Sequence, residues 1–253
     1  GMGGGLINVD VTGPVGRKVN AVYGIVDSSK TAIIEMSQAA GITLVSGDEK
    51  NPLYTTTFGV GELIKDAINK GCRHFVVGIG GSATNDCGIG MLQALGYEFL
   101  DKEGKQVGFG ASGVRDIVSI RDENVIKELS ECYFRVACDV NNPLCGDLGC
   151  SAIYGPQKGA TKEMVADMDG WLKNYSKIVK EKYPDADCEY PGTGAAGGLG
   201  YAFFNFTNSK LESGIKIVLD ETKLEEYVKD ADIVVTGEGR LDHQTVMGKA
   251  PVG

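Results

Sequence analysis

Apolar side chains recur at two spacings along the chain, and each spacing predicts one type of element. Short runs that alternate or are continuously apolar predict strands. Residues 6–11 and 18–26 are two such runs, and the Pro/Gly turn at 12–16 between them predicts a β-hairpin. Three further apolar runs predict buried strands, at 74–79, 133–138 and 231–235.

Apolar residues three and four positions apart predict helices. This spacing predicts a helix over 31–40, which Gly41 ends, and one long amphipathic helix over 161–182. Two more helices are expected, at 59–69 with a threonine as its N-cap, and at 220–229. Because strands and helices alternate, the sequence predicts an α/β fold, a mixed sheet with flanking helices.

The composition narrows the classes of function. The net charge of -9 argues against nucleic-acid binding but leaves a small anionic substrate open. The seven cysteines form no CxxC pair and only two histidines are present, which argues against a disulfide scaffold or a structural zinc site. We expect a cytoplasmic protein with reduced thiols and neither a signal peptide nor a membrane-spanning segment. Glycine is the outlier, because its 37 residues are about twice the usual share.

The first glycine-rich segment follows the apolar run 74–79. Its glycines let backbone N–H groups approach an anion, and the following helix points its positive end the same way. Asp86 is placed to position a metal-bound phosphate or to accept a proton, although a tight strand–helix turn is the alternative. The segment lacks a Walker A sequence and matches a dinucleotide fingerprint only loosely, so a nucleotide-dependent oxidoreductase has weak support. The candidate phosphate-binding residues are Gly80, Gly81, Ser82, Ala83, Thr84 and Asn85.

Two later segments also carry candidate ligands. Asp139 and two amides follow a predicted strand and suit hydroxyls or a hydrated magnesium ion, although an Asx-turn explains them equally well. Lys158 is a candidate phosphate partner, with a solvated surface lysine as the alternative. Dense glycines in 192–200 indicate a close backbone approach, either to a ligand or to neighbouring elements. The candidates in that segment are Gly194, Gly197 and Gly198.

The fourth segment, residues 236–242, follows the last predicted strand. That strand would deliver Glu238, Arg240 and Asp242 to one loop. Arginine binds phosphate or carboxylate through two parallel hydrogen bonds, and carboxylates hold magnesium or orient a hydroxyl. We therefore favour a functional role for this loop over a structural one.

Taken together, the motifs resemble one family. GIGGSATND, ACDVNNPL, YGPQKGAT, PGTGAAGGLG and VVTGEGRLDHQT occur here in the order found in bacterial-type glycerate kinases, and the resemblance extends from about Val9 to the last residue. It implies ATP-dependent phosphorylation of D-glycerate to phosphoglycerate with magnesium. It also implies a two-domain architecture, in which a large α/β domain is inserted into a Rossmann-like one. The family usually continues Asp-Gly-Gly-Ala-Gly after the first loop, whereas Cys87 and Ile89 replace two of these residues here.

The resemblance also gives expectations for organisation. The chain looks truncated at both ends, with the inserted domain at 6–230 and the start of the return to a mostly absent Rossmann-like domain at 231–253. A non-catalytic fragment or binding domain of such a kinase is the alternative function. We expect a small-molecule substrate, D-glycerate, and a possible homo-oligomer, because an exposed edge strand promotes association.

Roles for the site residues follow from the same reading. The glycine loops would hold the phosphates of ATP and magnesium would bridge them. Asp86 is our first choice for the general base or for orienting the hydroxyl, with Asp139 and Glu238 as competitors, and Arg240 would hold a carboxylate or phosphate. The candidate magnesium ligands are Asp139, Glu238 and Asp242.

Overall fold

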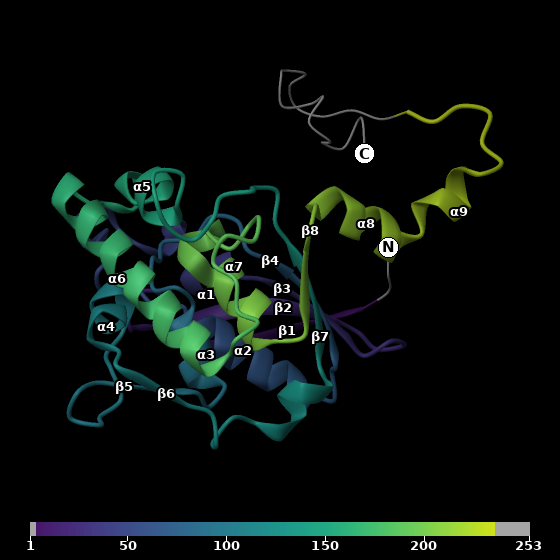
Figure 1. Cartoon of the computed structure of the whole chain (residues 1–253). Helices are drawn as coiled ribbons and strands as arrows, with labels where there is room; N and C mark the ends of the chain where they lie inside the picture. Colours follow the sequence, from purple (N-terminus) through teal and green to yellow (C-terminus); the bar gives the residue numbers. More distant parts are fainter. Residues whose placement is uncertain (1–3, 236–253) are drawn as a thin grey trace.

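A six-stranded mixed sheet forms the centre of the protein, as seen in a computed structural model that describes residues 4–235 (Figure 1). Its order is β1-β2-β3-β4-β7-β8, in which β1, β2 and β3 are antiparallel and β3, β4, β7 and β8 are parallel. The carboxyl ends of these four strands therefore meet at one edge. The strands are β1 (Gly5–Thr12), β2 (Lys18–Val26), β3 (Thr31–Glu35), β4 (His74–Gly78), β7 (Tyr133–Ala137) and β8 (Ser209–Glu212).

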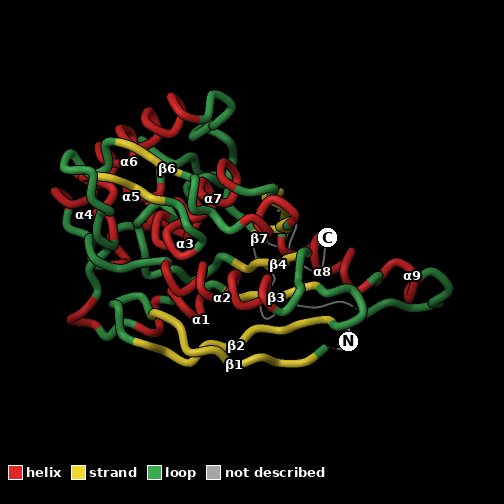
Figure 2. The backbone as a smooth tube through the Cα atoms, turned by 90° about the horizontal axis from the view of Figure 1, so that it is seen from below, coloured by secondary structure: helices red, strands yellow, loops and turns green. Residues whose placement is uncertain are grey.

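Helices cover one face of this sheet. Figure 2 shows α1, α2, α3 and α7 above the sheet, with α8 and α9 at the opposite end of the molecule from α4, α5 and α6. A small two-stranded sheet, β5 (Glu98–Leu100) and β6 (Ser119–Arg121), lies beside the helices. The helices are α1 (Ser37–Ala40), α2 (Phe58–Asn69), α3 (Ile89–Ala94), α4 (Gly110–Asp116), α5 (Cys150–Tyr154), α6 (Lys162–Lys182), α7 (Ala195–Phe206), α8 (Gly214–Thr222) and α9 (Leu224–Val228).

The core lies between the sheet and these helices. Alternate residues of the central strands are buried toward α2 and α7, as period-2 side chains require. The rings of Phe75 and Phe134 stack at 4.6 Å between centroids, and Phe134 meets Phe203 of α7 at 5.6 Å. This packing holds β4, β7 and α7 together.

Several predicted elements are confirmed. The hairpin forms as predicted, with Asp10 opposite Asn20, and the strand predictions at 74–79 and 133–138 correspond to β4 and β7. The long amphipathic helix is α6, which buries Met168, Leu172, Tyr175 and Val179 on one side. The predicted helix at 59–69 is α2.

Other predictions are wrong. Residues 31–35 are the strand β3 and only residues 37–40 are helical, because the apolar residues there face both sides of a central strand and mimic helical spacing. The helix expected at 220–229 is divided between α8 and α9 by Lys223, whose φ of 52° is left-handed. Residues 231–235 form no strand, and Ile233 and Val235 are 82% and 91% exposed, because no described strand lies beside them to pair with.

The threonine expected as the N-cap of α2 is confirmed by position, and the hydroxyl of the preceding Thr56 accepts a hydrogen bond from the N–H of Phe58, the first residue of the helix. Thr57 occupies the N-cap position of α2, but its own side chain caps no N–H group of that helix. Its hydroxyl donates to Asp86 and accepts a hydrogen bond from the backbone N–H of Met91. The hydroxyl of Thr57 therefore binds the carboxylate of Asp86 instead of capping α2.

Within residues 4–235, no helix is both long enough and apolar enough to cross a bilayer.

Candidate active site

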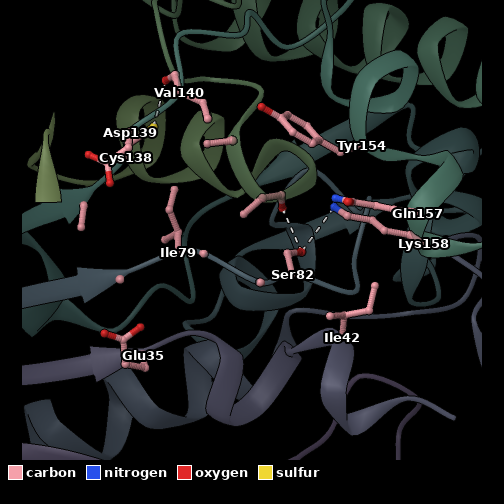
Figure 3. A pocket seen from close by; sticks show the side chains of 16 residues that line it. Glu35, Ile42, Ile79, Ser82, Cys138, Asp139, Val140, Tyr154, Gln157 and Lys158 are labelled. Atoms are coloured by element: carbon pink, nitrogen blue, oxygen red, sulfur yellow. Dashed lines mark hydrogen bonds between the residues drawn. The ribbon is translucent and has the colours of Figure 1, made fainter. Parts of the chain in front are cut away.

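A cavity of about 520 Å³ opens at the carboxyl ends of β3, β4 and β7 (Figure 3). The strand ends contribute Glu35, Gly78 and Asp139. The opposite wall comes from α5, the turn of 3₁₀ helix Pro156–Lys158, and the start of α7. This is the place where open α/β sheets bind ligands. The side chains that Figure 3 labels are Glu35, Ile42, Ile79, Ser82, Cys138, Asp139, Val140, Tyr154, Gln157 and Lys158.

The loop after β4 presents backbone donors to this cavity. Gly80, Gly81 and Ser82 all line it, as the sequence predicted for a ligand-binding loop. Within residues 4–235, the N–H groups of these three residues donate no hydrogen bond. Gly81 has a φ of 73°, and a side chain at Gly80 would meet no atom within 4 Å. Unengaged N–H groups in a glycine turn form a concave binding surface for anions.

Lys158 places a buried cation at the same cavity. Its residue is only 3% exposed, and its ammonium group donates to the carbonyl oxygen of Thr84 at 2.6 Å and to the hydroxyl of Ser82 at 3.5 Å. Within the described part of the chain, no carboxylate forms an ion pair with it. Burial lowers the pKa of Lys158 to about 8, although the nearby Cys150 and Asp86 act in the opposite direction. A buried ammonium group without an ion-pair partner is a candidate binding site for an anion.

Asp86 does not line the cavity. It is fully buried, and its carboxylate accepts hydrogen bonds from the N–H and hydroxyl of Thr57, both at 2.8 Å, and from the N–H groups of Gly88 and Gly90. Burial raises the pKa of Asp86, while these hydrogen bonds lower it. With this set of donors, the carboxylate ties the end of the glycine loop to the start of α2.

The other residues of this loop are buried, like Asp86. Thr84 is buried, and its hydroxyl contacts that of Ser82 at 2.8 Å. Asn85 is buried and donates to the hydroxyl of Ser151 at 2.9 Å, while its carbonyl oxygen has no hydrogen-bond partner among the described residues. Ala83 is held by Ala40 and Thr55 through its backbone. Of these three residues only Thr84 forms hydrogen bonds with Ser82 and Lys158, and none of them lines the cavity.

Two carboxylates do line the cavity. Asp139 extends from the end of β7, and its Oδ1 accepts a hydrogen bond from the N–H of Gly214 at 2.9 Å. Glu35 extends from the end of β3. The sequence did not identify it as a candidate, because the pattern there predicted a helix over 31–40. With residues 31–35 assigned to a central strand, Glu35 would have been recognised as a candidate, because ligands bind at the carboxyl ends of such strands.

The candidate metal ligands fall in two parts of the chain, Asp139 at the cavity and the others after residue 235. No group of three or more histidine, cysteine or acidic residues that suits a metal ion occurs within the part of the chain that the structure describes. The predicted site residues Glu238, Arg240 and Asp242 lie outside the described residues.

The glycines before and within α7 pack against backbone rather than line the cavity. A side chain on Gly194 would meet the carbonyl oxygen of Pro143, and one on Gly197 would meet that of Thr84. A side chain on Gly198 would meet the backbone of Cys87 at 2.8 Å, and both Gly197 and Gly198 are left-handed, with φ of 68° and 88°. Of the two interpretations that the sequence left open, close packing accounts for these three glycines.

Alanine substitutions in the two glycine segments should therefore differ sharply. Gly197→Ala is expected to lower the free energy of unfolding by about 2–4 kcal/mol, because left-handed backbone and a clash with Thr84 combine. Gly80→Ala should change it by less than about 0.5 kcal/mol, since its side chain enters open space. Urea denaturation at pH 7 measures both values, and equal values would contradict this assignment of the two segments.

The comparisons with known proteins agree with one another. The model of the glycerate kinase family matches residues 1–253. The chain is 50% identical to a glycerate kinase of Haemophilus influenzae over 99% of its length and 46% identical to a glycerate 2-kinase of Escherichia coli over 96%. A crystal structure of a "putative glycerate kinase 2" from Salmonella typhimurium LT2 matches 98% of the chain with a TM-score of 0.93 and 46% identity. The chain spans 66%, 64% and 66% of the lengths of these three proteins.

Proposed function

Because this chain belongs to the glycerate kinase family, we propose that it carries out the ATP-dependent phosphorylation of D-glycerate at the cavity beyond β3, β4 and β7. The observation that carries this proposal is Lys158, a buried cation without an ion-pair partner among residues 4–235, in the wall of that cavity. A site of this kind suits a small anion, and glycerate is a small hydroxy acid with one carboxylate.

The chemistry of the cavity walls supports an orientation for the acceptor. The carboxylate of D-glycerate would lie against Lys158, with the hydroxyl of Ser82 and the N–H groups of Gly80 and Gly81 as further donors. Its hydroxyls would then extend toward the strand ends that carry Glu35 and Asp139. Phosphoryl transfer depends mainly on positioning and on neutralising charge, and both are available here.

One carboxylate of the cavity suits a magnesium ion. Magnesium is usually held by one or two carboxylates together with waters and phosphate oxygens. Asp139 lies at the cavity with Oδ1 bonded to Gly214, which leaves Oδ2 for a magnesium-bound water. We propose Asp139 for this role, in which magnesium would neutralise the phosphate charge. Glu238 and Asp242 stay candidate ligands, and Arg240 a candidate anion partner.

Asp86 is proposed as a positioning residue and no longer as the base. It is fully buried, its oxygens already accept hydrogen bonds from Thr57, Gly88 and Gly90, and it is not among the residues that line the cavity. A base must come within about 3 Å of the hydroxyl proton that it removes. Glu35 and Asp139 meet that requirement better, because both reach the cavity itself.

The value of kcat/KM for D-glycerate is expected to fall above about pH 8. The pKa of Lys158 is lowered to about 8, so its ammonium group loses its charge above that pH and attracts the carboxylate less strongly. The expected slope is a tenfold decrease per pH unit. Lys158→Arg, which stays charged throughout, should lack this decrease, whereas a wild-type profile that is flat to pH 9.5 would contradict the assignment.

Turnover by the purified chain tests the proposed function. ADP formation is measured with ATP and magnesium, with and without D-glycerate, and ³¹P NMR identifies the phosphorylated product. We expect ADP to form in step with a phosphoglycerate. Binding of D-glycerate without ADP formation would favour the alternative of a binding domain, and the absence of both would refute the proposal.

A further inference from the structure

Glu35 is the carboxylate of the cavity whose chemistry is not yet accounted for. It is the last residue of β3, its side chain is exposed, and it lines the cavity next to Gly78. Figure 3 shows Glu35 and Asp139 on one side of the cavity, with Ser82, Gln157 and Lys158 toward the other. The cavity is therefore bipolar, with a cation at one end and carboxylates at the other.

The neighbouring strand provides room for this carboxylate. The backbone N–H of Met36 donates to the carbonyl oxygen of Gly78 at 2.8 Å, which fixes the ends of β3 and β4 together. A side chain at Gly78 would collide with both carboxylate oxygens of Glu35. Because Gly78 has no side chain, the carboxylate lies directly over the end of β4, where the ligand-binding loop begins.

Both oxygens of Glu35 are available to a ligand. Within residues 4–235, Glu35 accepts no hydrogen bond and forms no ion pair, whereas Asp139 is bonded to Gly214 and Asp86 to Thr57. Among the described carboxylates that line the cavity, Glu35 is the one with both oxygens free of hydrogen bonds, whereas Asp139 has one oxygen engaged. A carboxylate with free oxygens accepts hydrogen bonds from hydroxyl groups.

We propose that Glu35 is the catalytic residue that binds the reacting hydroxyl of the acceptor and removes its proton. This inference rests on the proposed function. With the substrate carboxylate at Lys158, the hydroxyl donates to Glu35. As the hydroxyl oxygen forms its bond to the γ-phosphorus of ATP, its proton passes to Glu35, and the bond from phosphorus to the bridging oxygen breaks to release ADP.

Glu35→Gln is the main test, because the amide keeps the size and a hydrogen-bond acceptor but cannot take the proton. We expect kcat to fall about 100-fold, in the range for loss of a general base, with KM for D-glycerate changed less than about threefold. The matched control is Glu181→Gln, an exposed glutamate of α6, which should leave both constants unchanged. Circular dichroism checks that each variant is folded.

Two kinetic results would overturn the assignment while leaving the proposed function intact. The first is wild-type turnover of D-glycerate together with a Glu35→Gln variant that keeps more than half of the wild-type kcat. The second is recovery of the variant at high magnesium concentration, which would make Glu35 a partner of the metal and not of the hydroxyl. A wild-type chain without turnover would instead count against the proposed function.

A binding measurement tests Glu35 even without turnover. Calorimetric titration compares D-glycerate with propanoate, which has the carboxylate but neither hydroxyl. The wild-type chain should prefer D-glycerate, and Glu35→Ala should lose most of that preference while still binding propanoate with the wild-type affinity. A preference that persists in Glu35→Ala, or a wild-type chain that has none, would overturn the inference.

Discussion

Replacement of Lys158 by methionine is expected to lower kcat/KM for D-glycerate by about 10²- to 10³-fold without unfolding the protein. Methionine keeps much of the length of the side chain but removes the only buried cation among the described residues that line the cavity. Loss of one preorganised charged donor typically has an effect of this size. Steady-state kinetics measures it, and Lys177→Met, an exposed lysine of α6, is the control that should keep full activity.

The same substitution has a signature in stability that separates charge from packing. Because the pKa of Lys158 falls from its ordinary 10.5 to about 8 on folding, the unfolded chain binds more protons between these pH values, and stability rises with pH there. The shift corresponds to roughly 3 kcal/mol between pH 8 and 10.5. The difference in unfolding free energy between wild type and Lys158→Met should change by an amount of this order over that range. A constant difference would show that Lys158 is not a buried cation.

Asp86→Ala is expected to destabilise the protein by about 3–5 kcal/mol. The substitution leaves the N–H and hydroxyl of Thr57 and the N–H groups of Gly88 and Gly90 without their buried acceptor. Unpaired buried donors cost about 1–3 kcal/mol each, and relaxation reduces their sum. Urea denaturation at pH 7 gives the value.

The control for this experiment is another aspartate. Asp167 is exposed on α6, so Asp167→Ala should change the free energy of unfolding by less than about 0.5 kcal/mol. If Asp86→Ala is equally mild but abolishes turnover, Asp86 acts in the chemistry and the positioning role is wrong. A large loss of stability is the result that the hydrogen-bond network predicts.

The fold was predictable from the sequence where local pattern and tertiary environment agree. The hairpin, α2, β4, β7 and α6 are examples, because period-2 or helical spacing there matches one buried face. The pattern misled at 31–35, since a central strand buries residues on both faces and loses its alternation. At 231–235 an apolar run alone predicted a strand, but a strand also needs a neighbour, and only tertiary structure provides one.

The candidate site was predictable in part. Predicted residues from three separate segments line one cavity, namely Gly80, Gly81 and Ser82, then Asp139, then Lys158. The sequence could not distinguish glycines that face a ligand from glycines that pack against backbone, because both occur in the same kind of glycine-rich segment. Sequence reasoning also chose Asp86 and did not consider Glu35, since proximity to a motif is visible in the sequence, whereas burial and access to a cavity are not.

A crystal structure of the chain with D-glycerate tests the central claim most directly. The account predicts that the ligand lies in the cavity beyond β3, β4 and β7, with its carboxylate within hydrogen-bond distance of the ammonium group of Lys158. Density for D-glycerate at a different place, with this cavity empty, would contradict it.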